Sequence, residues 1–199
     1  MVDALWYGML IVAGFLAGIV NTIAGGGSFL TLPALMLFGL DPQVANGTNR
    51  IAVLLSSASA TLTFDKHGHL DRQLAIRLAV PTILGVPFGA LLAIKLPATA
   101  FEGVFGLLFL AMAALLVSNP KRLTEKTTSK PRPPVSMFAI FFGIGIYVGF
   151  IQAGMGILLL LAMSLLKTGN LVVSNAVKNL IGFLVTSMAT LMFVFYGLV

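Results

Sequence analysis

Two polar clusters interrupt the apolar stretches of this chain, and each combines amide side chains with one cation. The first, from Ala45 to Arg50, reads Ala-Asn-Gly-Thr-Asn-Arg, and the second, from Ser174 to Asn179, reads Ser-Asn-Ala-Val-Lys-Asn. A cation inside an apolar helix is costly at membrane depth unless it faces water or a counterion. The simpler interpretation is that Asn and Thr cap helices while the cation reaches lipid headgroups. Because the pattern recurs, we favour an electropositive cavity suited to a small oxyanion.

A glycine-rich segment, at which we expect a helix to break, precedes each cluster. The first reads Ala-Gly-Gly-Gly-Ser from Ala24 to Ser28, and the second reads Gln-Ala-Gly-Met-Gly from Gln152 to Gly156. Glycine permits backbone conformations that other residues resist. A helix that starts at such a break directs free amides and the positive end of its dipole toward an anion. Small residues four apart are typical of helix packing instead. Three pairs fit that second pattern: Gly14/Gly18, Gly85/Gly89 and Gly145/Gly149.

The two breaks and the two clusters together form the candidate site for an anion. Its expected donors are backbone amides at the breaks and the amide, hydroxyl and cationic groups of the clusters. The candidate substrate-binding residues are Gly25, Gly26, Gly27, Ser28, Asn46, Thr48, Asn49, Arg50, Gln152, Gly154, Met155, Gly156, Asn175, Lys178 and Asn179. No catalytic residue, metal ligand or cofactor is predicted, because the chain has no cysteine and only two histidines.

These features lie at equivalent points of an internal repeat. Gly14 to Phe64 aligns without a gap with Gly143 to Phe193, 129 residues further along the chain. The offset places glycines on glycines at both breaks and Asn46 on Asn175. In transporters built from repeats, the substrate site lies where the two copies meet. The repeat therefore points to the same residues as their chemistry does.

Composition places these elements in a membrane. The chain is 58% hydrophobic and 9% charged, with a mean hydropathy of +1.04, whereas soluble domains carry roughly 25% charged residues. Several apolar runs approach the roughly 20 residues that a helix needs to cross a bilayer. They do not alternate as barrel strands do. The sequence therefore predicts an all-α fold, a polytopic transmembrane helical bundle with an internal repeat and broken helices.

Eight helical segments are expected. They are Ala4 to Ala24, Ser28 to Leu40, Val44 to Phe64, Gln73 to Ile94, Ala98 to Val117, Ser136 to Gln152, Ile157 to Leu166 and Val172 to Tyr196. The second segment, like the seventh, is too short to cross alone, since about thirteen residues reach about 20 Å against roughly 30 Å of hydrocarbon. We expect each of the two to begin inside the membrane, at its glycine break.

A polar, proline-rich linker separates the two copies. Between Ser118 and Val135 it carries five basic residues and one acid, which by the positive-inside rule places it in the cytoplasm. Three crossings separate equivalent points of the two copies, which puts the copies in opposite orientations, an inverted repeat. We expect a first transmembrane repeat at 1–118, a basic cytoplasmic linker at 119–135, and a second, shorter repeat at 136–199.

Several function classes are disfavoured or left open. A nucleic-acid partner is disfavoured because the basic residues behind the net charge of +6 flank apolar helices. An enzyme is disfavoured because Asp65 and Glu102 are isolated acids without a catalytic partner. An anion channel is left open, since the same donors line channels, and so is a structural or assembly protein. The expected partners are a small anionic substrate and the lipid bilayer, and a homo-oligomer is left open.

Essentially the whole chain resembles a known family, and the most specific stretch runs from Gly18 to Thr48. The residues that carry the resemblance are Gly14 to Gly18, Thr22 to Gly27, Leu32 to Leu35, Gly39 and Ala45 to Thr48. They are similar to the sulfite exporter TauE/SafE family, also described as the sulfonate uptake permease superfamily. The resemblance implies a multi-pass carrier of sulfite or organosulfonates in the bacterial inner membrane. Ser28 stands where the family's glycine run often continues, and nothing in the second copy answers Gln73 to Val117.

The expected mechanism is alternating access, with the anion held between the two breaks while one copy rocks against the other. Export of an anion is downhill in an inside-negative cell by about 2.3 kcal/mol per charge per 100 mV, so it can run without a coupling ion. Uptake would need a proton or sodium ion. Asp41, Asp65 and His67 are the candidate proton carriers, but all three lie at loop ends, where a solvated role is favoured.

Overall fold

The computed structural model describes residues 2–118, 134–165 and 170–199, and these residues fold into helices without a strand. The helices are α1 (Val2–Ile23), α2 (Ser28–Leu37), α3 (Pro42–Lys66), α4 (Arg72–Lys95), α5 (Ala98–Ser118), α6 (Pro134–Phe150), α7 (Met155–Ser164) and α8 (Leu171–Phe195). The predicted all-helical class is confirmed for this part of the chain. The predicted linker at 119–135 lies largely outside the described residues.

Local sequence explains where the long helices begin. α3 begins at Pro42. A backbone N–H at this first position would have no acceptor within the helix, so proline, which lacks the N–H, forfeits no hydrogen bond there. The side chain of Asp71 accepts a hydrogen bond from the backbone of Leu74 at the start of α4, at 2.9 Å. Asn170 does the same for α8, accepting from the backbone of Val172 at 2.9 Å. These caps satisfy backbone donors that no helical carbonyl can reach.

Two of the described helices, α4 and α8, are long and apolar enough to cross a membrane, judged by length and composition. Shorter apolar helices surround them, among them α2 and α7, which have ten residues each. At 1.5 Å per residue, a ten-residue helix covers only about half of the hydrocarbon core. Both short helices therefore need neighbours around their ends.

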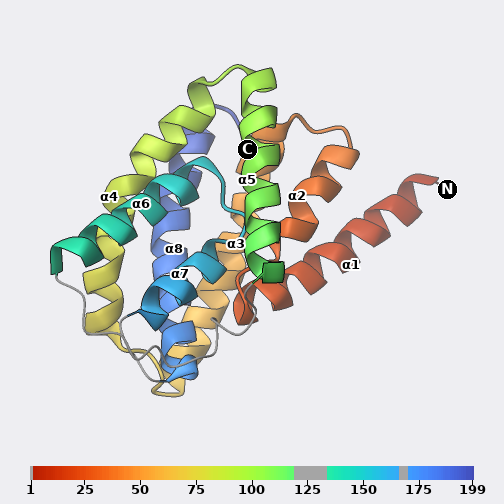
Figure 1. Ribbon diagram of the computed structural model, residues 1–199. Helices are drawn as coiled ribbons and strands as arrows, with labels where there is room; N and C mark the ends of the chain where they lie inside the picture. The colour runs from red at the N-terminus through yellow and green to blue at the C-terminus, as the bar shows by residue number, and fades with distance from the viewer. Residues whose placement is uncertain (1, 119–133, 166–169) are drawn as a thin grey trace.

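The main core forms where α4, α6 and α8 pack together. Figure 1 shows α8 passing behind α6 and α7, with α4 at the edge of the bundle. Buried apolar residues of these helices form one cluster that also includes Met155 and Leu159 of α7. A second cluster joins α2, α5 and the end of α6 around Phe101 and Phe150. By contrast, the N-terminal half of α1 extends away from the other helices in Figure 1.

Glycines bring α4 and α6 into backbone contact. A Cβ added at Gly85 would lie 2.2 Å from the carbonyl oxygen of Phe142, and one at Gly145 would lie 2.0 Å from that of Thr82. Gly89 and Gly149 are equally confined. The packing role predicted for these two pairs is confirmed, and it follows the rule that small residues let membrane helices approach closely.

The packing role predicted for Gly14 and Gly18 is wrong for the described residues. A Cβ added at either position would meet no atom within 4 Å. The reason is that both glycines border a pocket between α1, α2 and α3, so the neighbouring helices do not approach them closely. Small residues four apart permit close approach, but they do not supply the neighbour.

Two helices of the repeat correspond closely in the structure. Both α3 and α8 have 25 residues, and both their first and their last residues are 129 positions apart, at Pro42 and Leu171 and at Lys66 and Phe195. The short helices α2 and α7 also match in length. The sequence offset therefore relates elements of the fold as well as residues.

Candidate functional site

The two glycine segments touch through their backbones. α1 ends at Ile23 and α2 begins at Ser28, whereas α6 ends at Phe150 and α7 begins at Met155. Between the helices of each pair, one glycine has a positive φ, +81° at Gly25 and +73° at Gly154. A Cβ added at Gly25 would lie 2.2 Å from the Cα of Gly156. Only glycine allows that approach and that backbone angle together.

Arg50 is the largest fully buried side chain among the described residues, and it binds the end of α6. Its Nη1 donates to the carbonyl oxygen of Val148 at 3.0 Å, and its Nη2 donates to that of Gly149 at 2.7 Å. Its guanidinium also lies 4.4 Å from the ring centroid of Phe193. The last carbonyls of a helix lack intrahelical donors and carry partial negative charge, so a cation is stabilising there.

Lys178 makes the reciprocal contact from the second copy. It lies on α8, and its Nζ donates to the carbonyl oxygens of Thr22 at 2.8 Å and Asn21 at 3.2 Å, at the end of α1. Asn179 adds a long hydrogen bond to the same carbonyl of Thr22, at 3.4 Å. A buried cation of α3 therefore binds the last turn of α6, and a buried cation of α8 binds the last turn of α1.

Amide side chains of the two clusters and of the second glycine-rich segment make further buried contacts. Asn46 donates from Nδ2 to the carbonyl oxygen of Phe150 at 2.9 Å. Gln152 donates to the hydroxyl of Thr186, on α8. Three buried amide oxygens have no hydrogen-bond partner among the described residues: Asn46 Oδ1, Gln152 Oε1 and Asn175 Oδ1. Unpartnered buried acceptors are costly, so these oxygens are candidates for contact with water or a ligand.

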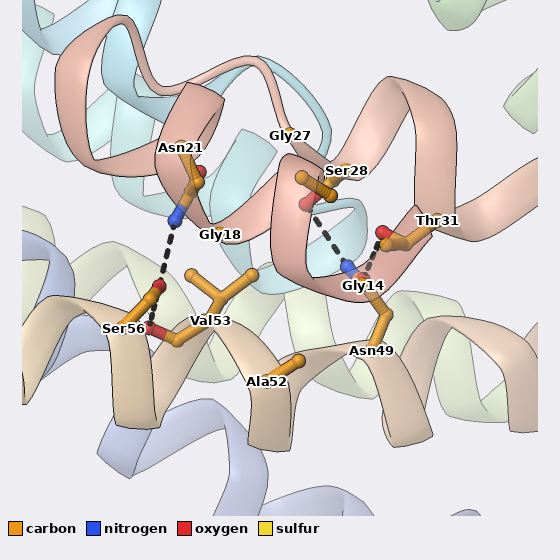
Figure 2. A pocket seen from close by; sticks show the side chains of 11 residues that line it. Gly14, Gly18, Asn21, Gly27, Ser28, Thr31, Asn49, Ala52, Val53 and Ser56 are labelled. Atoms are coloured by element: carbon orange, nitrogen blue, oxygen red, sulfur yellow. Dashed lines mark hydrogen bonds between the residues drawn. The ribbon is translucent and has the colours of Figure 1, made fainter. Parts of the chain in front are cut away.

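A pocket of about 30 Å³ lies between α1, α2 and α3. Figure 2 shows its polar side chains, Asn21, Ser28, Thr31, Asn49 and Ser56, turned toward one another. Asn49 donates from Nδ2 to Ser28 Oγ at 2.9 Å and accepts a hydrogen bond from Thr31 Oγ1. Asn21 donates from Nδ2 to Ser56 Oγ at 3.2 Å. The pocket therefore offers amide and hydroxyl groups without a charged side chain in its lining.

The structure divides the predicted site residues between two places. Three of them line the pocket: Gly27, Ser28 and Asn49. The glycine contact and the helix-end contacts involve Gly25, Gly156, Asn46, Arg50, Lys178 and Asn179. Gln152 and Gly154 lie in the second glycine-rich segment. The backbone carbonyl of Asn175 accepts a hydrogen bond from the side chain of Asn179 at 2.9 Å. Gly26 lies beside Ile157, Met155 is buried in the main core with its backbone N–H on Gln152, and Thr48 is half-buried outside the pocket lining.

Sequence reasoning missed Asn21, Thr31 and Ser56, which complete the pocket. Asn21 and Ser56 each have a polar neighbour, Thr22 and Ser57, but no glycine run or cation marks these positions, so their sequence signal is weak. The contact between Arg50 and Phe193 could not be predicted either, because the two residues lie far apart in the sequence.

Charged groups at the loop between α3 and α4 form a separate exposed pair. Arg72 donates from Nη2 to Asp65 Oδ2 at 2.6 Å and from Nε to Oδ1 at 3.0 Å. This hydrogen bonding to Arg72 holds the pKa of Asp65 below its usual value. Asp65 is therefore ionised at neutral pH, which suits a solvated loop residue better than a proton carrier. Within the described ranges, no three His, Asp or Glu residues gather as metal ligands.

Known proteins similar to this chain are membrane transporters by name. The "Probable membrane transporter protein ORF9" of Sinorhizobium sp is 30% identical over 190 residues, covering 96% of this chain and 73% of the relative. The "Probable membrane transporter protein YfcA" of Escherichia coli is 32% identical over 186 residues, covering 91% and 67%. A "Probable membrane transporter protein" of Haemophilus influenzae is 30% identical over 165 residues, covering 82% and 64%.

The comparison with family models covers almost the whole chain. The chain spans about two thirds to three quarters of the length of the relatives above. No solved structure matches it. The family model described as "Sulfite exporter TauE/SafE" matches residues 10–199, including both glycine breaks, both polar clusters and the pocket. This chain is a member of the sulfite exporter TauE/SafE family of membrane transporters.

Proposed function

We propose that this chain carries a small sulfur-containing anion, sulfite or an organosulfonate, across the bacterial inner membrane, in the direction of export. Membership of the TauE/SafE family supports transport, and the description of that family supports the class of substrate. The observation that carries the proposal is the polar pocket at the start of α2 (Figure 2). The pocket gathers hydroxyl and amide groups, which can bind an oxyanion, in an otherwise apolar part of the chain.

The pocket suits an anion because of where its donors stand. Ser28 is the first residue of α2, so its hydroxyl lies at the positive end of the helix dipole. Thr31 and Asn49 add a hydroxyl and an amide within hydrogen-bonding distance of one another. An oxyanion that enters would replace these mutual hydrogen bonds with bonds to its own oxygens.

The small size of the pocket suggests that anion binding is accompanied by helix movement. A volume of about 30 Å³ holds about two water molecules, less than an oxyanion of sulfur requires. We therefore propose that binding moves α1 or α2 away from α3. This movement lies within the first copy, and in the proposed inverted-topology repeat it precedes the rocking of one copy against the other about the contact of Gly25 with Gly156.

The direction of transport follows from electrostatics. An inside-negative potential drives an anion outward by about 2.3 kcal/mol per charge per 100 mV. The described pocket has no acidic side chain in its lining to carry a proton. Uncoupled export is therefore the simplest cycle that these residues support.

The test is thermal unfolding of the purified protein in detergent with sulfite, thiosulfate, sulfate, sulfoacetate, taurine, phosphate or chloride. A ligand that binds only the folded state stabilises it by about 2.7 kcal/mol at 100 times its Kd. We expect a selective rise in melting temperature with sulfite or a sulfonate, and loss of that rise in Ser28→Ala.

The matched control is Ser187→Ala, because the Ser187 hydroxyl donates to the carbonyl of Phe183 within α8, outside the pocket lining. It should keep the full response to the anion. A response that is equal for all anions, or that survives in Ser28→Ala, would remove this pocket as the substrate site.

A further inference from the structure

Four buried side-chain atoms near the end of α6 have no hydrogen-bond partner among the described residues. They are Asn46 Oδ1, Arg50 Nε, Gln152 Oε1 and Thr190 Oγ1. The residues that carry them are at most 8% exposed. An amide oxygen can only accept a hydrogen bond, a guanidinium nitrogen can only donate one, and a hydroxyl can do either. Unpartnered groups are costly at such depth, so their presence in one region calls for an occupant.

The first two of these atoms belong to neighbouring side chains of α3. Asn46 and Arg50 are four residues apart, so they lie on one face of the helix. Asn46 Nδ2 donates to the carbonyl oxygen of Phe150 at 2.9 Å, and Arg50 Nη2 donates to the same oxygen at 3.5 Å. Because its nitrogen is engaged in this way, the amide of Asn46 leaves its oxygen without a donor.

The other two atoms connect the end of α6 with α8. Gln152 follows the last residue of α6 by two positions, and its Nε2 donates to the hydroxyl of Thr186. Thr190 lies one turn beyond Thr186, and the aromatic ring of Phe193, three residues further, lies 4.4 Å from the guanidinium of Arg50. Residues three and four apart share a helix face. We call this group the α6-end site, and it consists of Asn46, Arg50, Gln152, Thr186, Thr190 and Phe193.

The protein balances the positive charge of this site only in part. Arg50 donates to main-chain carbonyls of α6, and the end of a helix carries the equivalent of roughly half an elementary negative charge. No acidic side chain is buried among the residues that the structure describes. A buried cation normally faces an opposite charge or water. An anion is therefore the occupant that completes both the charge and the hydrogen bonds.

We propose that the α6-end site binds a monovalent oxyanion that carries its own hydrogen-bond donor, such as hydrogensulfite or a hydroxysulfonate. Its oxygens accept from Arg50 Nε and from the hydroxyl of Thr190, and its O–H donates to the amide oxygen of Asn46 or Gln152. An oxyanion without an O–H, such as sulfate, places its lone pairs against those two oxygens and is disfavoured. The inference rests on the proposed function and narrows its class of substrate.

The α6-end site differs from the pocket of Figure 2 and shares no residue with it. The 129-residue offset carries Ser28 and Ser56 of the pocket to Ile157 and Val185, so the second copy does not repeat the pocket's polar lining. The α6-end site instead joins α3 of the first copy to α6 and α8 of the second. The anion thus has two positions, one within the first copy and one between the copies. Occupation of the second needs the end of α6 to move from α3, as the proposed rocking provides.

The test compares ethanesulfonate with isethionate, which has the same charge and one additional hydroxyl. The rise in melting temperature of the purified protein in detergent, measured against concentration, gives the Kd of each anion. We expect isethionate to bind about five- to tenfold more tightly, the size of one net hydrogen bond. Gln152→Met and Asn46→Leu each remove one amide oxygen and should reduce this preference. Thr190→Val should weaken the binding of both anions.

The matched control for Thr190→Val is Thr82→Val, which should keep both affinities. Thr82 is also buried, and its hydroxyl donates to the carbonyl of Leu78 within α4, at 2.7 Å. The preference is a ratio of two affinities for one protein, so a uniform loss of stability in a variant does not change it.

The outcomes separate this inference from the proposed function. Equal binding of the two sulfonates by the unaltered protein would overturn the inference alone. A preference that survives in both Gln152→Met and Asn46→Leu would also overturn it, and loss of that preference in Ser28→Ala would then assign the hydroxyl to the pocket. The absence of stabilisation by any sulfur anion would overturn the proposed function and this inference together.

Discussion

At the scale of single residues, the two buried cations change the interpretation of the polar clusters. The sequence favours Arg50 and Lys178 as anion ligands, whereas in the structure their nitrogens donate to main-chain carbonyls at the ends of α6 and α1. A lone cation in an apolar helix needs a negative partner. The sequence shows that need, but the identity of the partner depends on tertiary contacts between distant segments.

Replacing Arg50 tests this role. Arg50→Met leaves the carbonyls of Val148 and Gly149 without donors, at about 1–3 kcal/mol for each buried carbonyl. We expect a clear fall in stability, measured by denaturant titration in detergent. Arg77→Met, at an exposed position on α4, should have little effect. A stable Arg50→Met protein that has lost its response to sulfite would instead identify Arg50 as a ligand.

At the scale of helices and breaks, much of the structure follows from the sequence. Apolar runs predict the helices, and the expected start of the third at Val44 lies two residues from its position at Pro42. The break residues are also foreseeable, since consecutive glycines disfavour a continuous helix. What could not be foreseen is which small residues meet a close neighbour. Gly85 and Gly14 carry the same spacing pattern, but only Gly85 lies in close contact with another helix.

The contact between the two breaks can be isolated by one pair of substitutions. Gly25→Ala and Gly39→Ala both place a side chain at a positive φ, of +81° and +89°, at roughly 1–2 kcal/mol each. Only at Gly25 does the new Cβ also collide with backbone, 2.2 Å from Gly156, because Gly39 is surrounded by open space. We therefore expect Gly25→Ala to lose more stability, by a further 1–3 kcal/mol or so. Equal losses in thermal unfolding would show that the breaks do not touch.

The packing of α4 on α6 gives a second helix-scale prediction. A Cβ at Gly89 would lie 1.8 Å from the carbonyl oxygen of Ile146, so Gly89→Ala should destabilise the protein by about 1–3 kcal/mol. Gly103→Ala on α5 is the control, since open space surrounds it, and it should be neutral or stabilising by up to about 1 kcal/mol. Denaturant titration of both variants measures the difference, and similar values would contradict the packing.

At the scale of the whole molecule, the two copies are joined by contacts that the proposed carrier cycle would alter. The copies meet at the glycine contact, at the two helix-end contacts and through the packing of α3 on α8. Sequence duplication predicts that the copies meet, but the duplication alone does not specify which groups join them. The pocket of Figure 2, by contrast, lies within the first copy.

Transport in liposomes tests the proposed cycle. Vesicles loaded with sulfite should show saturable counterflow of labelled sulfite, because a carrier exchanges substrate across the membrane without net movement. An inside-negative potassium diffusion potential should speed net efflux, since each charge gains about 2.3 kcal/mol per 100 mV. A rate of sulfite efflux that does not change with the membrane potential would contradict uncoupled export. Current without counterflow would indicate a channel.

The helix-end contacts of Arg50 and Lys178 have one more consequence, for how sequence change affects them. Both cations recognise main-chain oxygens, which every residue type provides. A substitution at an accepting position therefore leaves the acceptor oxygen in place, although packing still restricts the side chain at Gly149, where a Cβ would lie 2.2 Å from the carbonyl oxygen of Val86. These helix-end contacts depend on the path of the main chain and not on the side chains of the accepting residues.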